Sequence, residues 1–118
     1  MSLTADDWLG QVRVAVQCYF PDAPVQVEVV RHTRVTFRVE IGRERFADLF
    51  FREETERTDY ALIVDGKRVF GIDNLGGWHE HPLSDAGIHR PCPAPTPMEA
   101  MQRLREANDS LVPDNDDQ

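Results

Sequence analysis

The sequence has few of the features that hold a small secreted protein together or anchor a chain in a membrane. It contains only two cysteines, Cys18 and Cys92, which lie far apart in the chain. No apolar run approaches the ~20 residues of a membrane-spanning helix. The N-terminus, MSLTADDWLGQ, lacks the basic start and the apolar segment of a secretory signal. We therefore expect a cytoplasmic protein with reduced thiols, and a bridge between the two cysteines is the less favoured alternative.

Basic residues are also outnumbered, since 21 Asp and Glu against 13 Lys and Arg give a net charge of −8. This balance argues against nonspecific binding of nucleic acid. Part of the excess lies in the final stretch, DSLVPDNDDQ, which contains four acids and no base. At 118 residues the chain has the length of one domain. We expect that domain to span residues 1–108 and a disordered acidic tail to span residues 109–118.

Two helices are predicted from their capping residues and their apolar spacing. Thr4 can cap a helix over about residues 4–19, in which apolar side chains recur at helical intervals. Thr96-Pro97-Met98-Glu99 has the pattern of a capping box with proline at the first helical position, and it predicts a helix over about residues 97–107. The buried stripe of this second helix is predicted to contain Met98, Met101 and Leu104.

Between these helices apolar and polar residues alternate with the period of half-buried strands. The runs are VQVEVV (25–30), RVTFRVEI (34–41), RFADLFFRE (45–53), DYALIV (59–64) and KRVFGI (67–72). Asp65-Gly66 is a strong hairpin signal between the last two. The predicted fold is therefore α+β: a five-stranded antiparallel meander sheet packed with an N-terminal helix and a short C-terminal helix. A long His- and Pro-rich loop separates the last strand from the last helix.

Arginines gather on one face of the second predicted strand. Arg34 and Arg38 share that face with Thr36, whereas Phe37 points to the opposite face. Sheets that bind RNA usually interleave aromatic residues that stack on bases. We therefore interpret the arginine face as a solvated surface with cross-strand Glu partners.

The stretch from Asp73 to Pro95 shows no period, and its prolines argue against both helix and strand. Three of the four histidines, His79, His81 and His89, lie in it. In an extended segment His79 and His81 point the same way, so they can chelate one metal ion, and loop closure can add His89 and Cys92. Imidazole and thiolate ligands favour zinc or another late transition metal. The alternative is that the histidines are solvated or bond the loop backbone.

The same histidines can instead exchange protons near neutral pH, which is the chemistry of a general acid and base. Arg90, next to His89, can hold a phosphate, so the set would suit cleavage of a phosphodiester. Asp73 and Asn74 also have a structural interpretation, because both side chains bond nearby backbone and end strands well.

A strand that ends in Asp73-Asn74, followed by His79 and His81 and then by Ile88-His89-Arg90-Pro91, resembles a known pattern. The TumE-type family, small toxins of bacterial and archaeal toxin–antitoxin pairs, carries a strand ending in an Arg-Tyr-Asp-Asn-like motif and then a His-rich loop with a Pro-His-His-x-His-like cluster. The chain is similar to this family over about residues 60–104. Gly71 and Ile72 stand where the family has Arg and Tyr.

This resemblance implies a ribonuclease in which His79, His81 and His89 transfer protons and Asp73 orients a histidine. Arg90, Asn74 and Trp78 would bind the RNA, and a small antitoxin protein would be the partner. The competing hypothesis is a non-enzymatic α+β module that binds a metal ion, a small ligand or a protein through the same loop. In both cases the exposed edge of a meander sheet makes a homodimer plausible.

Overall fold

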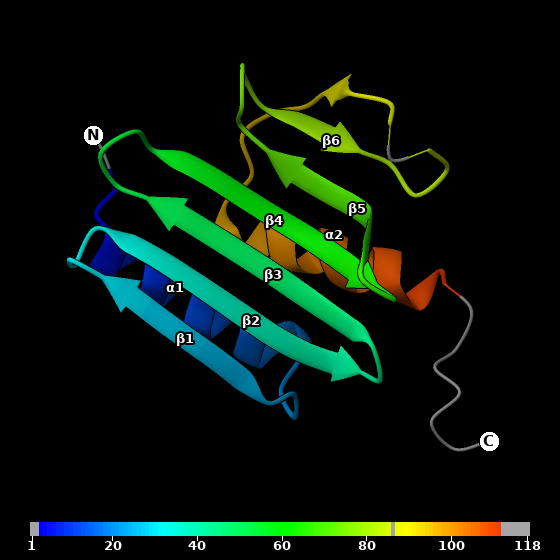
Figure 1. Ribbon diagram of the computed structural model, residues 1–118, viewed down its shortest axis with the longest axis horizontal. Coiled ribbons are helices and arrows are strands. Elements are labelled where there is room, and N and C mark those ends of the chain that lie inside the picture. The colour runs from blue at the N-terminus through cyan, green and yellow to red at the C-terminus, as the bar shows by residue number, and fades with distance from the viewer. Residues whose placement is uncertain (1–2, 86, 112–118) are drawn as a thin grey trace.

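Seven antiparallel strands form one sheet, and two helices cover one of its faces (Figure 1). The computed structural model describes residues 3–85 and 87–111. The strands lie side by side in chain order: β1 (Val25–Val30), β2 (Arg34–Gly42), β3 (Arg45–Arg52), β4 (Arg57–Val64), β5 (Lys67–Asp73), β6 (His79–His81) and β7 (Arg90–Pro91). Helix α1 (Ala5–Tyr19) precedes them and helix α2 (Pro97–Asp109) follows them. The predicted α+β class and meander order are thus confirmed, and the predicted number of strands is corrected from five to seven.

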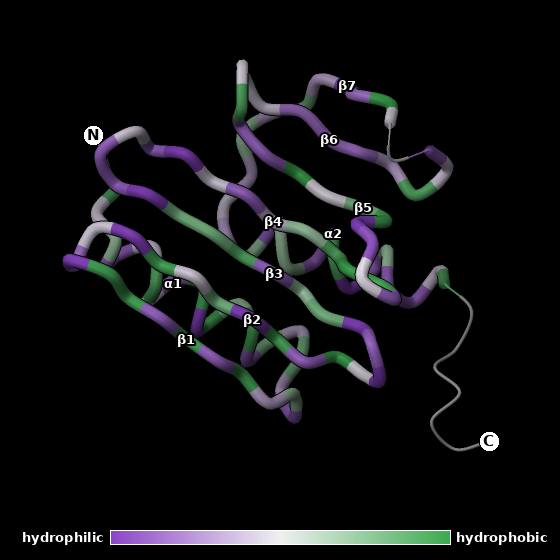
Figure 2. Tube along the Cα trace, viewed as in Figure 1, coloured by the Kyte–Doolittle hydropathy of each residue, from purple (hydrophilic) through white to green (hydrophobic). Residues whose placement is uncertain are grey.

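The core lies between the sheet and the helices. Helix α1 packs on β2 and β3, α2 packs on β4 and β5, and the two helices contact each other. Inward residues alternate with polar outward residues along the strands, as the hydropathy colouring of β2 shows (Figure 2). At the centre Trp8 Nε1 donates a hydrogen bond to the Tyr60 hydroxyl at 3.1 Å. Burial raises the pKa of Tyr60 to about 12, although the bond from Trp8 acts in the opposite direction.

Both predicted helix starts are confirmed. The Thr4 hydroxyl accepts from the Asp7 N–H at 3.0 Å. At α2 the capping box is complete, since Thr96 and Glu99 each accept a bond from the backbone N–H of the other. The predicted buried stripe of α2 is wrong in one residue: Met101 and Leu104 are fully buried, but Met98 is 36% exposed. The buried face of α2 is formed by Pro97, Ala100, Met101, Leu104 and Ala107, so Met98 lies off that face.

The hairpin turns follow from local sequence. Asp65 and Gly66 have φ angles of 52° and 77°, which matches the predicted tight turn between β4 and β5. Arg31 and His32 also adopt positive φ, at 54° and 61°, in the turn between β1 and β2. His32, the fourth histidine of the chain, thus lies between β1 and β2, whereas the other three lie on or next to β6 and β7 at the opposite edge of the sheet.

The stretch predicted as an irregular loop contains the last two strands. β6 pairs with β5, and β7 pairs with β6. Pro91 is compatible with β7 because β7 is the edge strand, where a missing N–H breaks no ladder. The sheet thus extends through residues 79–81 and 90–91, contrary to the prediction from the prolines, whereas the other described residues between Asp73 and Pro95 form turns and irregular chain.

Two further predictions concern the ends and the environment of the chain. Helix α2 ends at Asp109, the first residue of the stretch predicted as the acidic tail. Most of the predicted acidic tail, residues 112–118, lies outside the described residues. Neither helix within the described ranges has the length and apolar character needed to cross a bilayer.

Candidate functional site

The turn between β5 and β6 brings the histidine-bearing segment back onto the sheet. Gly76 and Gly77 have φ angles of 72° and 114°, which glycine adopts without strain. The returning strand sets His79 opposite Asp73 and His81 opposite Gly71. Directly opposed residues of an antiparallel pair share a face. Because Ile72 lies in the core on the helix side, His79 and His81 project from the open face of the sheet.

The imidazole rings of His79, His81 and His89 lie together on this open face. Their ring centroids are 4.8 Å apart for His79 and His81, 4.9 Å for His79 and His89, and 4.4 Å for His81 and His89. One nitrogen of each ring lies within 4.8 Å of the other two. His81 is buried, His79 half-buried and His89 exposed. The gathering of the three rings that the sequence suggested is therefore present in the fold, and we call it the histidine cluster.

Asp73 anchors the histidine cluster to the sheet. Its side chain is only 5% exposed, and its two carboxylate oxygens lie 3.3 Å from His79 Nε2 and 3.1 Å from His81 Nε2. The Leu75 N–H donates to Oδ1 at 3.0 Å. Burial alone would raise the pKa of Asp73, but the bonds from Leu75 and His81 and the charges of His79 and Arg68 together outweigh burial and lower that pKa. Asp73 is thus held as an anion beneath two imidazoles.

The two ring nitrogens of His79 both lie near oxygen atoms that accept hydrogen bonds. Its Nδ1 lies 3.0 Å from the Gly77 carbonyl oxygen, which can only accept, so Nδ1 must carry a proton. In the neutral ring Nε2 then has a lone pair, and this lone pair faces an Asp73 carboxylate oxygen at 3.3 Å. Two acceptors at that distance repel unless a proton or a metal ion neutralises them.

Arg68 supports Asp73 from the neighbouring part of the open face. Its Nη2 lies 3.3 Å from Asp73 Oδ2 and 2.8 Å from Asp59 Oδ1. Arg57 reaches the same Asp59 at 3.5 Å. Burial raises the pKa of Asp59, the charges of Arg68 and Arg57 act the other way, and the charge of Asp73 adds to the rise. The histidine cluster therefore ends a line of alternating charges across β4 and β5.

Sequence reasoning missed Arg68 because a β-bulge changes its face. Arg68 and Asp73 are five positions apart, so a regular strand would place them on opposite faces. The register of β4 with β5 shifts between Leu62 and Ile63, and Arg68 pairs with Ile63 on the open face. The guanidinium then lies over Gly71, whose missing side chain leaves room for it. No sequence signal marks this bulge apart from Gly71 itself.

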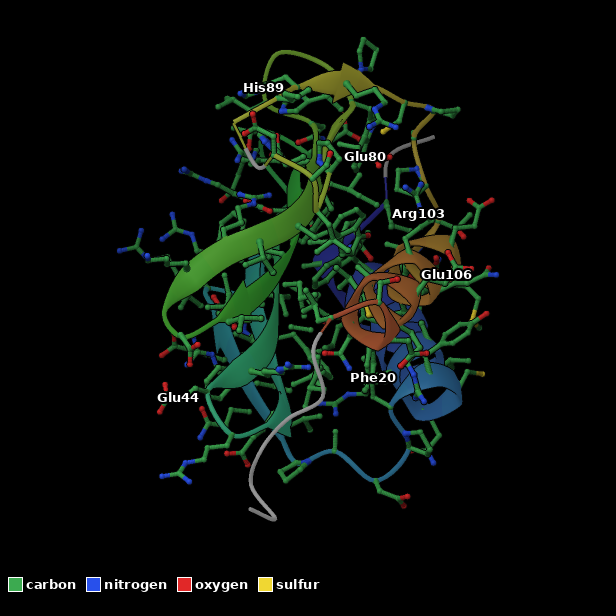
Figure 3. All side chains as sticks on the ribbon, turned by 90° about the vertical axis from the view of Figure 1, so that its right-hand side faces the viewer. Phe20, Glu44, Glu80, His89, Arg103 and Glu106 are labelled. Carbon is green, nitrogen blue, oxygen red and sulfur yellow. The ribbon has the colours of Figure 1, made fainter. Side chains whose placement is uncertain are left out.

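The residue between the two strand histidines points to the other side of the sheet. Glu80 is 8% exposed, and its Oε2 accepts from Arg103 Nη2 of α2 at 2.6 Å. Figure 3 shows Glu80 and Arg103 toward the helices and His89 at the far end of the sheet. This ion pair fixes β6 against α2, and the alternation of strand side chains then directs His79 and His81 outward.

Two predicted site residues are not brought to the histidine cluster. Arg90 pairs opposite Glu80, so its side chain leaves β7 on the helix-covered side, away from the imidazoles. Cys92 is not among the residues that converge in the described part of the chain. Burial, together with the charges of Glu80 and Asp73, raises the pKa of Cys92 against the effect of Arg103, which disfavours the thiolate that binds metals or attacks substrates. Both cysteines are free, and no bridge joins them.

Asn74 and Trp78, predicted to bind substrate, hold the backbone of the site. The Asn74 Oδ1 accepts from the Thr58 N–H at 2.9 Å, and its Nδ2 donates to the Glu56 carbonyl at 2.7 Å. Trp78 packs against the core, and its carbonyl accepts from the Cys92 N–H at 3.2 Å. The structural interpretation of Asn74 therefore matches its contacts, and Trp78 pins the returning chain to the sheet.

The open face beyond the histidine cluster carries both arginines and aromatic rings. Arg38 makes a two-point ion pair with Asp48, which lies opposite it on β3, at 2.7 and 2.9 Å; the cross-strand partner is thus an aspartate and not the predicted glutamate. Its guanidinium also lies 4.3 Å from the centre of the Phe46 ring. Phe50 lines a shallow hollow of about 790 Å³ that also contains Arg38 and Arg68. The prediction that this face lacks aromatic residues considered only Phe37 of β2 and missed Phe46 and Phe50, which β3 contributes.

Comparison of the chain with protein-family models, with curated proteins and with solved structures found no match. What the histidine cluster can do is therefore argued from its own residues and geometry.

Proposed function

We propose that this protein binds a divalent transition-metal ion, zinc in first place, through His79, His81 and His89. The observation that carries the proposal is the convergence of one nitrogen from each ring within 4.8 Å. Ligand nitrogens around a tetrahedral zinc lie roughly 3.3 Å apart, because Zn–N bonds are about 2.0–2.1 Å long. A separation of 4.8 Å must close by about 1.5 Å, which takes rotation of the imidazole side chains, and the exposed His89 is the one least held by its surroundings.

The surroundings of the histidine cluster support a metal ion better than three solvated rings. A metal ion on His79 Nε2 neutralises the contact with the Asp73 carboxylate at 3.3 Å. The Gly77 carbonyl and Asp73 fix ring tautomers in the way that second-layer acceptors do around zinc ligands. Three imidazole ligands leave one position of a tetrahedral ion, which either Asp73, 3.3 Å from His79 Nε2, or a water molecule would fill; bound water would become a nucleophile near neutral pH.

The experiment is a zinc titration of protein dialysed free of metal, followed by calorimetry. We expect one ion per chain in the natural protein and loss of that binding in His81→Ala. His32→Asn is the matched control, since it removes the histidine in the β1–β2 turn and asparagine tolerates its φ of 61°. Equal zinc affinity in His81→Ala and His32→Asn would overturn the proposal.

A second candidate is cleavage of RNA by the same histidines as general acid and base, with Asp73 orienting His81 through the 3.1 Å contact. The hollow with Phe50, Arg38 and Arg68 favours this candidate, because single-stranded RNA binds where aromatic and basic side chains alternate. In this candidate the protein is a toxin with an antitoxin partner, which stays a prediction from the TumE resemblance. Metal-free protein that cleaves RNA, with the activity lost in His81→Ala, would favour it over metal binding.

A further inference from the structure

The two edges of the sheet differ in their protection against pairing with another strand. At one edge β7 is two residues long and ends in Pro91, and short strands and prolines are devices that block edge pairing. At the other edge β1 is six residues long, without proline or lysine, and its pairing with β2 has no irregularity. Figure 1 shows β1 as the free outer strand on the side away from β6. Such an edge is a template for a further strand.

The free backbone groups of β1 belong to Val25, Val27 and Val29. The Pro24 carbonyl accepts from the Glu40 N–H at 2.9 Å, so even-numbered residues of β1 face β2 and odd-numbered residues face outward. Within the described part of the chain, no other strand pairs with this side of β1. Val25 and Val29 are also 41% and 43% exposed, because the helices do not cover them.

We propose that β1 pairs antiparallel with β1 of a second copy of this chain, about a twofold axis at Val27. Val27 then lies opposite its own copy, and Val25 lies opposite Val29 of the partner subunit. All outward N–H and C=O groups of the three valines find partners, which makes about six backbone hydrogen bonds. The valine side chains contact one another on the helix side. On the open face the Gln26 amide donates to the Glu28 carboxylate of the partner subunit.

Other registers are less favourable for reasons of charge and bonding. A shift of one residue sets the outward backbone N–H and C=O groups of one strand against residues of the other strand whose groups bond β2. It also places the valines of one copy opposite Gln26 and Glu28 of the other. A shift of two residues in one direction places Glu28 opposite its own copy, and like charges directly opposite are destabilising. A shift of two in the other direction sets Val29 opposite Ala23, which lies outside the strand. Only the Val27 axis uses the whole strand without a like-charge pair.

Oxidative crosslinking tests the register in a Cys18→Ser background, which removes the exposed natural thiol. Val27→Cys places two thiols opposite each other with Cα atoms about 5.5 Å apart, within the range of a disulfide. Val25→Cys is the matched control, since its copies lie four residues out of register, roughly 13 Å apart. We expect a crosslinked dimer with Val27→Cys alone. A dimer with neither variant, or equally with both, would overturn the proposal.

Charge variants test the pairing without a new bond. Gln26→Glu sets like charges opposite each other at both Glu28 positions of the dimer, while inside the chain residue 26 pairs beside Arg38, which favours the folded monomer. Sedimentation equilibrium should show a dimer of the natural chain that Gln26→Glu weakens by about tenfold. Gln26→Glu with Glu28→Lys restores it. A natural chain that stays monomeric, or a Gln26→Glu dimer of unchanged affinity, would refute the pairing. Metal-free protein gives the same result, because β1 is at the far edge from the histidine cluster.

Discussion

Gly71→Ala tests whether Arg68, the residue that sequence reasoning missed, supports Asp73 beneath the histidine cluster. A Cβ at position 71 would lie 2.5 Å from Arg68 Nε and closer still to Nη2, so the guanidinium must move. The move breaks its contacts at 2.8 Å with Asp59 and at 3.3 Å with Asp73. Hydrogen bonds to charged groups contribute about 1.5–3 kcal/mol, whereas alanine in a strand gains about 0.5–1 kcal/mol over glycine. We expect the free energy of unfolding to fall by about 1 kcal/mol.

The sign of this effect depends on Arg68, which makes a double-mutant cycle decisive. An Arg68→Ala background removes the three atoms nearest to a Cβ at position 71, so Gly71→Ala should there raise the free energy of unfolding by about 0.5–1 kcal/mol. Urea unfolding followed by fluorescence of Trp8 and Trp78 measures both changes. Equal effects of Gly71→Ala in the two backgrounds would refute the account of Arg68 and Gly71.

Three further predictions concern the core and the helices. The pKa of Tyr60 is raised to about 12, so its neutral form stabilises the fold fully below pH ~10. This contribution of up to ~2.7 kcal/mol is lost as the pH rises toward ~12. Alkaline unfolding with the same midpoint in Tyr60→Phe would contradict this. Arg103→Met leaves buried Glu80 without its 2.6 Å partner, so it should lower the free energy of unfolding by about 1–3 kcal/mol. Adding Glu80→Gln should recover most of that loss. No recovery in thermal melts would count against this ion pair. Thr96→Ala should cost about 1 kcal/mol through the lost cap of α2, and an unchanged melting temperature would show that the cap is dispensable.

Helices and hairpins were predictable from sequence because short-range signals determine them. Thr4 and Thr96 are typical N-cap residues and predict the helix starts, and Asp65-Gly66 predicts a turn that requires positive φ at both positions. Met98 was misjudged because helical spacing alone does not tell which residues at the edge of the apolar stripe are covered, and the buried face runs through Pro97, Ala100 and Met101 instead. The extent of burial is set by tertiary packing.

The last two strands were not predictable because they are too short to show a period. β6 and β7 have three and two residues, and the prolines around them point to a loop. Their pairing depends on partners that are distant in sequence, such as Arg103 for Glu80. The same holds for Arg68, which a bulge turns toward Asp73.

The histidine cluster was accessible to sequence reasoning in part. The i, i+2 spacing of His79 and His81 predicts a shared face in any extended segment, and that prediction is confirmed. The position of His89 depends on the return of the chain from β6 to β7, which spacing alone leaves open. Arg90 and Cys92 were included because they are near in sequence, and the register of β6 with β7 places Arg90 on the other side of the sheet.

The most direct test of metal binding is X-ray absorption at the zinc edge of protein loaded with one equivalent of zinc. The account predicts three imidazole nitrogens at about 2.0–2.1 Å, one further light atom and no sulfur. His81→Ala should lose the imidazole signal, and His32→Asn should keep it. A sulfur ligand at about 2.3 Å, or a shell of water oxygens without imidazole, would contradict the account.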